Sequence, residues 1–286
     1  MDLLNTWQFN YLGYLVGVVV FFQLYKLAVK KTQQDGAATL LLQFLAGGSI
    51  LLLFPLFPFS FPTDWKVYGL LVLASIFYAV NDRLQTTARK HLQVSVFSVL
   101  NQLSTVFLII LGLTFFREPL ILSKLVGAGL IVMGNVVLLY KKGEIRFDKY
   151  ILMTVLAVLS FAFAISIDIG ISKQFNLPFY IMLTLVVPAF MIWFAEKIPL
   201  KVIVGEFNGE ARKFYIATGI AWGLTILFAL RSFQLGEVTT IVPLQALSVL
   251  ANVLVAYFFL GEKKDEIKKV LAALIVIAGV YLTVLG

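Results

Sequence analysis

The chain has 286 residues, of which 60% are hydrophobic and only 13% are charged, and its mean hydropathy is +0.95. Soluble domains carry about 25% charged residues, so a water-soluble globule of this composition would expose large apolar patches, and a disordered chain is excluded too. The chain has no cysteine, which excludes disulfide frameworks, cysteine-ligated metal centres and thiol catalysis. The net charge of +8 would indicate a nucleic-acid partner only if the basic residues shared a water-exposed face.

Long apolar runs follow one another along the chain with short connections. A helix needs about 20 mostly apolar residues to cross roughly 30 Å of hydrocarbon. Runs of that length cover residues 9–29, 37–58, 66–88, 94–116, 123–140, 150–172, 177–195, 214–233, 238–260 and 267–285. They are longer than membrane β-strands and do not alternate polar with apolar residues. Because backbone amides in lipid need partners within their own segment, the sequence predicts an all-α membrane protein with ten transmembrane helices.

The first run does not have the features of a cleavable signal peptide. Residues 1–8 carry no Lys or Arg, and no small-residue cleavage pattern follows the run. We therefore expect it to be the first membrane helix.

An internal repeat relates the two halves of the chain at a shift of 144 residues. Residues 94–140 align with 238–284 without a gap, with 14 identities in 47 positions. Apolar composition alone could produce many of these matches, but Glu118 also falls on Glu262 and Lys124 on Lys268, and charges are scarce. We expect one five-helix repeat over 1–142 and a second over 143–286, within one membrane unit. An odd number of helices per repeat inverts the second copy, an arrangement common in secondary transporters, whose substrate site lies between the copies.

Two segments resemble a known family. FFREP at 115–119 and PLQALSVLANVLVAYFFLGEK at 243–263 are each followed by a helix with small residues, GAGLIVMG at 127–134 and AALIVIAG at 272–279. In these segments the chain resembles the EamA-like, ten-helix members of the drug/metabolite transporter superfamily. The resemblance implies transport of amino acids, sugars, nucleotide-linked sugars or other metabolites, and no residue in the sequence chooses among them.

The family pattern is matched at some positions and not at others. An acidic residue just after the fourth and ninth helices is matched by Glu118 and Glu262, and the proline at the start of the ninth helix by Pro243. The chain departs where Val99 stands in place of a proline in the fourth helix, and where residues 21–23 replace the Trp-Gly of the first. From their recurrence we expect the two glutamates to cap or tie helices rather than to contact substrate.

Polar residues inside the apolar runs are the candidates for a binding site. No phosphate-binding loop, zinc-protease helix or nucleophile elbow is present, so we expect no enzyme, no metal site and no cofactor. Polar side chains are costly in lipid and mark functional sites, although they also tie helices together. The internal repeat supports some of these candidates, because the shift of 144 residues aligns Tyr78 with Trp222, Asn81 with Thr225 and Asn101 with Gln245. The candidates to line a substrate cavity are Gln23, Tyr78, Asn81, Asn101, Trp222, Thr225, Gln245 and Asn252.

Two carboxylates fall within the apolar runs. Asp82 and Asp168 could exchange a proton inside the membrane and couple transport to a proton gradient. The alternative is a structural ion pair, since Arg83 and Arg89 are near Asp82, or a position at the membrane interface, since both carboxylates lie in the last third of their runs. The sequence leaves both possibilities open.

Together these patterns predict a secondary transporter that moves a small organic metabolite by alternating access between two inverted repeats. The expected partners are a small-molecule substrate, the lipid bilayer and protons as a candidate coupling ion, with no nucleic acid. A flippase for lipid head groups, or a membrane assembly factor with the same fold, is the alternative.

The charge distribution predicts how the chain lies in a membrane, which we expect to be a bacterial-type inner (plasma) membrane. The odd-numbered connections carry 18 of the 23 Lys and Arg residues and 10 of the 15 acidic residues, so the whole excess of +8 lies on one face. Positively charged connections stay in the cytoplasm. This rule places both termini outside, although the family usually keeps both in the cytoplasm.

Overall fold

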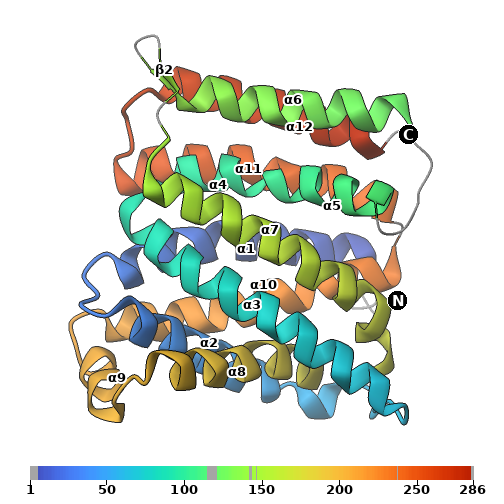
Figure 1. Cartoon of the computed structure of the whole chain (residues 1–286), viewed down its shortest axis with the longest axis vertical. Coiled ribbons are helices and arrows are strands. Elements are labelled where there is room, and N and C mark those ends of the chain that lie inside the picture. The colour runs from blue at the N-terminus through green and yellow to red at the C-terminus, as the bar shows by residue number, and fades with distance from the viewer. Residues whose placement is uncertain (1–5, 115–120, 142–143, 146, 237, 285–286) are drawn as a thin grey trace.

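The computed structural model describes residues 6–114, 121–141, 144–145, 147–236 and 238–284, and most of them are helical (Figure 1). The first half contains α1 (Trp7–Val29), α2 (Asp35–Leu51), α3 (Trp65–His91), α4 (Val94–Asn101), α5 (Leu103–Thr114) and α6 (Leu122–Leu139). The second half contains α7 (Lys149–Ile171), α8 (Leu177–Glu196), α9 (Leu200–Phe207), α10 (Arg212–Leu235), α11 (Val238–Leu260) and α12 (Glu266–Val284). Two short 3₁₀ turns, Phe54–Leu56 and Ser172–Gln174, follow α2 and α7.

The helices occupy the predicted apolar runs, and the all-helical membrane class is confirmed. Among the described residues, five helices have the length and apolar composition to cross a membrane: α1, α3, the 149–168 part of α7, α8 and α10. The apolar segments 35–51, 94–108, 122–138 and 247–260 are shorter. The number of membrane crossings therefore stays a prediction.

Four local features differ from the predicted runs and connections. The second helix ends at Leu51 rather than near residue 58, because Pro55 opens a 3₁₀ turn in place of a further α-helical turn. The fourth run is broken at Gln102, between α4 and α5. The predicted connection at 197–213 contains the short helix α9, and the connection after α6 contains a small hairpin in which Tyr140–Lys141 pairs antiparallel with Glu144–Ile145.

The helices pack mainly as pairs that join the two halves of the chain. Helix α1 packs along α10, α3 along α7, α2 along α8 and α6 along α12. Figure 1 shows α6 and α12 at one edge of the bundle and α2 and α8 toward the other. The larger hydrophobic core gathers Tyr25, Leu42 and Tyr180, and a smaller one joins α6, α11 and α12 through Ile131, Val249 and Val276.

Glycines allow the closest of these pairs to form. A methyl group at Gly127 would lie 2.5 Å from the Gly279 carbonyl oxygen, and one at Gly279 would lie 2.7 Å from the Gly127 carbonyl oxygen. Only the absence of a Cβ lets the backbones of α6 and α12 approach so closely.

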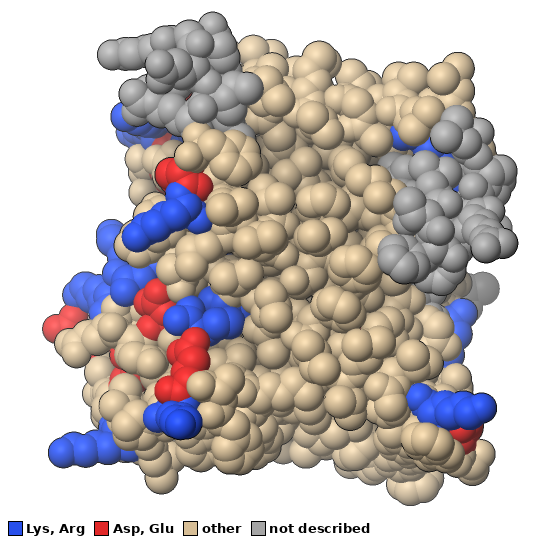
Figure 2. Space-filling view, in the orientation of Figure 1, with Lys and Arg blue, Asp and Glu red and all other residues tan. Residues whose placement is uncertain are grey.

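The two ends of the bundle differ in charge. In Figure 2, Lys and Arg gather mostly at the end that carries α9, and a band of uncharged residues covers the middle of this face. We call the end with α9 the charged end, and the opposite end, where α1 begins and α12 finishes, the terminal end (Figure 1). Three ion pairs lie at the charged end: Lys31–Glu210 joins two connections, Arg83–Glu196 joins α3 to α8, and Lys90–Asp35 joins α3 to α2. At the terminal end, the Asn176 side chain donates to the carbonyls of Phe54, Phe57 and Pro58.

Candidate functional site

A cavity of about 290 Å³ lies inside the bundle, near the lower end of the range for small-molecule sites. Side chains from both halves of the chain line it, contributed by α1, α3, α4, α5, α7, α8, α10, α11 and α12. Its wall combines apolar and aromatic side chains with a few polar and charged groups. This composition is typical of a site that holds an organic molecule and fixes its orientation.

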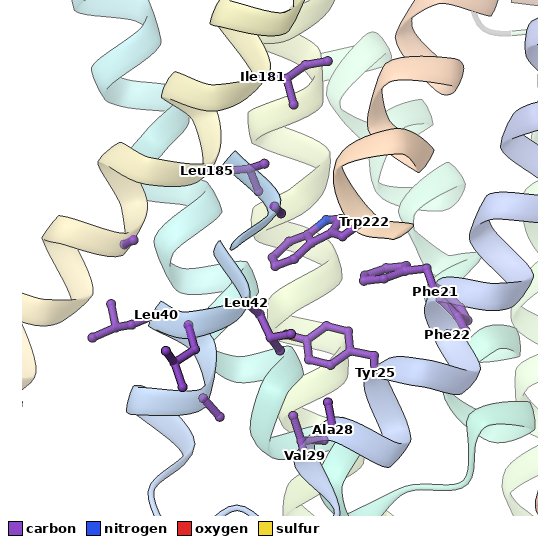
Figure 3. Packing of buried hydrophobic residues seen from close by; sticks show 14 of the residues in the cluster. Phe21, Phe22, Tyr25, Ala28, Val29, Leu40, Leu42, Ile181, Leu185 and Trp222 are labelled. Atoms are coloured by element: carbon purple, nitrogen blue, oxygen red, sulfur yellow. The ribbon is translucent and has the colours of Figure 1, made fainter. Parts of the chain in front are cut away.

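One wall of the cavity is aromatic. The Trp222 indole stacks on the Phe21 ring with centroids 5.5 Å apart and an angle of 22° between the planes, and lies 5.9 Å from the Tyr25 ring (Figure 3). Gly219 and Gly223 let α10 approach α2, because a methyl group at Gly219 would lie 2.5 Å from the Leu45 side chain. The close packing of α10 thereby fixes the position of Trp222.

Asp82 is buried in a ring of amide groups. One of its oxygens accepts hydrogen bonds from Asn81 Nδ2 at 2.8 Å and Gln85 Nε2 at 2.7 Å, and the other accepts from Gln43 Nε2 at 2.7 Å. No Lys or Arg lies within ion-pair distance of Asp82 among the described residues, and Arg83 pairs instead with Glu196. The predicted alternative of an ion pair at Asp82 is therefore wrong for these residues, because amides from α2 and α3 satisfy the carboxylate.

Asp168 is held by two tyrosines. The Tyr78 hydroxyl donates to one carboxylate oxygen and the Tyr180 hydroxyl to the other, each at 2.5 Å. The carboxylate is only 2% exposed, yet it borders the cavity. This arrangement joins α3, α7 and α8 through a single acidic group.

Arg89 is buried in the last turn of α3, at the part of the cavity nearest the charged end. Its Nε donates to the Gln85 side-chain oxygen at 3.2 Å. Its guanidinium carbon lies 4.0–5.2 Å from the centroids of four rings, those of Phe21, Phe22, Tyr25 and Phe97. Cation–π attraction from several rings stabilises a charge in such surroundings.

The break between α4 and α5 lies in the cavity wall. The Gln102 amide turns back to the Val99 and Leu100 carbonyls instead of continuing the α-helix, and Asn101, Gln102 and Ser104 all line the cavity. Interrupted helices near the middle of a membrane are common around transporter substrates, because they free backbone polar groups.

Hydrogen bonds join neighbouring helices at the charged end. Lys26 Nζ donates to the carbonyls of Arg89, Lys90 and Leu92 at 2.7–2.8 Å. Glu262 accepts from the backbone amides of Val94 and Ser95, the first residues of α4. The expectation that Glu262 caps or ties helices is confirmed, whereas Glu118 lies outside the described residues.

Most of the predicted cavity residues come together at this cavity. It is bordered by Tyr78, Asn81, Asn101, Trp222 and Thr225, and by both carboxylates, Asp82 and Asp168. Gln23 and Asn252 are not among its lining residues. Gln23 Nε2 instead donates to the Asn252 carbonyl and side-chain oxygens at 3.4 Å, which fits the interhelical alternative. Gln245 lies on α11, and its side chain is outside the described residues.

Several lining residues were missed by the sequence analysis. The most polar of them are Gln85, Arg89, Gln102, Thr105 and Thr184. Two of these were visible as a pattern, because Tyr78, Asp82, Gln85 and Arg89 recur at spacings of four, three and four along α3 and so share one face. Gln102, Thr105 and Thr184 carried no comparable signal.

Comparisons with known proteins agree with this architecture. Residues 9–140 match the model of the EamA-like transporter family. The resemblance to EamA-like transporters is confirmed. A solved structure, described only as the crystal structure of a protein, is similar over 96% of this chain and 97% of its own, at 16% identity and a TM-score of 0.65. At that identity the likeness shows the fold alone, and the search of curated proteins gives no match. The EamA-like match supports an integral membrane transporter of the drug/metabolite type.

Proposed function

We propose that the protein is a secondary transporter that moves a small organic metabolite across the membrane by alternating access between two inverted five-helix repeats. The observation that carries the proposal is the cavity between the halves, which is lined by Trp222 from one half and by Asn81, Asp82 and Arg89 from the other. No ATP-binding motif is present in the sequence, so a gradient drives the movement.

The helix boundaries and pairings support two repeats over 1–142 and 143–286. A shift of 144 positions takes Val94 to Val238 and Leu122 to Glu266, the first residues of α11 and α12. The same shift relates α1 to α7 and α3 to α10. The α1–α10 pair and the α3–α7 pair therefore exchange places when the halves are exchanged, while the α2–α8 and α6–α12 pairs map onto themselves. A two-fold axis between the halves accounts for this pattern.

Hydrogen bonds and ion pairs hold the helices together at the charged end. The Lys26 and Glu262 contacts and the three ion pairs cross that end, while the cavity lining extends along α5 to Leu108 and along α10 to Phe233 toward the terminal end. Alternating access requires these contacts at the charged end to break as the terminal end closes.

Substitution of Trp222 tests the proposed cavity. Trp222→Ala removes the indole from the cavity wall, and we expect uptake into proteoliposomes to fall at least about tenfold, because loss of a large aromatic contact costs more than about 1.4 kcal/mol of binding. Trp65→Ala is the matched control, since Trp65 is 76% exposed and outside the cavity. Wild-type transport by folded Trp222→Ala would contradict the proposed site.

The lipid-handling alternative is tested by thermal unfolding of the purified protein. Saturable stabilisation of the protein by phospholipids instead of soluble metabolites would favour that alternative.

We also propose that Asp168 or Asp82 carries a coupling proton. Both line the cavity, and Asp168 makes hydrogen bonds with two hydroxyls that can follow a change in its protonation. A pH gradient should then accelerate wild-type uptake, and replacing the coupling residue by Asn should remove that acceleration while exchange of substrate without a gradient continues. Gradient-driven uptake by both Asp82→Asn and Asp168→Asn would exclude both residues.

A further inference from the structure

Arg89 carries a buried positive charge, and no described acidic side chain forms an ion pair with it. It is 4% exposed, and the ion pairs among the described residues are Lys31–Glu210, Arg83–Glu196 and Lys90–Asp35. A charge inside a membrane protein is costly unless it is paired or functional. The four surrounding rings lower this cost but do not use the N–H groups of the guanidinium.

The neighbouring carboxylate does not neutralise Arg89 by contact. Gln85 stands between the two groups, accepting from Arg89 Nε and donating to Asp82, whose oxygens already accept three amide hydrogen bonds. This arrangement fixes the orientation of the guanidinium. It also leaves the charge available to another anion.

The terminal nitrogens of Arg89 have no hydrogen-bond partner within the described part of the chain. A guanidinium has five N–H donors, and Nε supplies the one hydrogen bond that Arg89 makes to a described side chain. Because Arg89 lines the cavity, its two terminal nitrogens can be reached by a ligand. A planar pair of donors matches the two oxygens of a carboxylate.

We propose that Arg89 binds the carboxylate of the transported substrate through two parallel N–H···O hydrogen bonds. The inference rests on the proposed transport function and narrows its substrate class to organic monocarboxylates. The ring of Trp222 and the Phe21 side chain form an apolar wall for the rest of the molecule. A second anionic group is disfavoured, because the other two charged groups of the cavity are the acidic Asp82 and Asp168.

The test uses matched ligands that differ only in charge. The purified full chain is screened by thermal shift against a library of carboxylate metabolites, each beside its own primary carboxamide, and with and without an α-amino group. The proteins are wild type, Arg89→Gln, Arg89→Lys and the control Arg212→Gln, whose guanidinium lies over the exposed end of α9 at Phe207. Uptake of each binding compound into proteoliposomes is measured in parallel.

We expect carboxylates to bind wild type and Arg212→Gln at least about tenfold more tightly than their amides, since a hydrogen bond to a charged group exceeds a neutral one by that order. In Arg89→Gln this ratio should fall to about one, and in Arg89→Lys it should stay above one. The ratio compares two ligands within one variant, so it is informative even if Arg89→Gln is less stable. The pairs with and without the amine separate amino acids from other organic acids.

Three results would overturn the assignment: binding of amides as tight as that of carboxylates, an unchanged ratio in Arg89→Gln, or no carboxylate that binds saturably. The transport proposal fails separately, if carboxylates bind through Arg89 but none is carried into vesicles. Conversely, uptake of a neutral compound that needs Trp222 but not Arg89 would keep the transport proposal and reject the carboxylate site.

Discussion

The two cavity carboxylates are satisfied by different kinds of donor, and this difference decides how each responds to substitution. Among the described residues, Asp82 accepts from side-chain amide NH₂ groups, which cannot become acceptors without turning over. Asp168 accepts from tyrosine hydroxyls, which can rotate and accept in turn. The donors around Asp82 therefore cannot change their role when the carboxylate is replaced, whereas the hydroxyls around Asp168 can.

This difference predicts unequal effects of the same change. Asp82→Asn brings an NH₂ group against an amide donor and leaves a buried polar group unsatisfied, so we expect a loss of about 1–3 kcal/mol of stability. Asp168→Asn should cost less, because one tyrosine can accept from the new NH₂ group. Thermal unfolding in detergent measures both, and an equal or larger loss in Asp168→Asn would contradict the argument.

Residue type and helical spacing predicted part of the cavity. Tyr78, Asn81 and Trp222 stood out because polar or aromatic groups are unusual inside apolar runs, and the repeat paired them. Arg89 falls just outside the predicted run 66–88 and was named only as a possible partner of Asp82, since the sequence does not show that four rings and Gln85 enclose its charge. The partner of Gln23 could not be predicted either, because the rotation of α1 against α11 depends on packing.

At the scale of helices, the α6–α12 contact depends on two glycines that face each other's backbone. A Cβ at Gly127 would meet the Gly279 carbonyl oxygen, and backbone atoms cannot move aside as a flexible side chain can. Gly129, two positions along the same helix, has open space around its Cα. Position rather than residue type should therefore determine the effect of substitution.

Gly127→Ala is expected to destabilise the protein by about 1–3 kcal/mol, because overpacking forces the two helices apart. Gly129→Ala should stabilise it by up to about 1 kcal/mol, because alanine favours the helix. Both values come from unfolding in detergent. Equal effects of the two substitutions would contradict the close approach of α6 and α12.

Glu262 connects the end of α11 to the start of α4. Its carboxylate accepts from the amides of Val94 and Ser95, where a negative charge also interacts favourably with the helix dipole. Glu262→Gln removes the charge and one acceptor, and we expect a loss of about 1 kcal/mol. Asp265→Asn, an exposed change in the same connection, is the control. If the two variants unfold at the same temperature, the cap contributes nothing measurable.

Helix positions were easier to predict than helix interruptions. Apolar length fixed the boundaries of α3, α7 and α11 to within three residues, since the hydrocarbon thickness sets that length. The break at Gln102 had no proline to mark it, because Val99 stands where the repeat has Pro243. Gln102 lines the cavity, and the sequence around it does not show that it has these polar neighbours.

At the scale of the whole molecule, the charge distribution and the usual topology of EamA-like transporters predict opposite orientations. The basic excess gathers at the charged end, and the positive-inside rule places that end in the cytoplasm with both termini outside. Family habit predicts the reverse. Both orientations use the same helices, so they differ only in which end of the bundle faces the cytoplasm.

Labelling of single cysteines can determine the orientation, because the chain has no cysteine of its own. Lys173→Cys marks the terminal end and Lys201→Cys, on α9, the charged end, and both positions are exposed. With a membrane-impermeant maleimide on intact cells, we expect Lys173→Cys to react at once and Lys201→Cys only after permeabilisation. The cysteine-free wild type is the control for background. The opposite pattern would show that the charge bias does not set the orientation, and the charged end would then face outward.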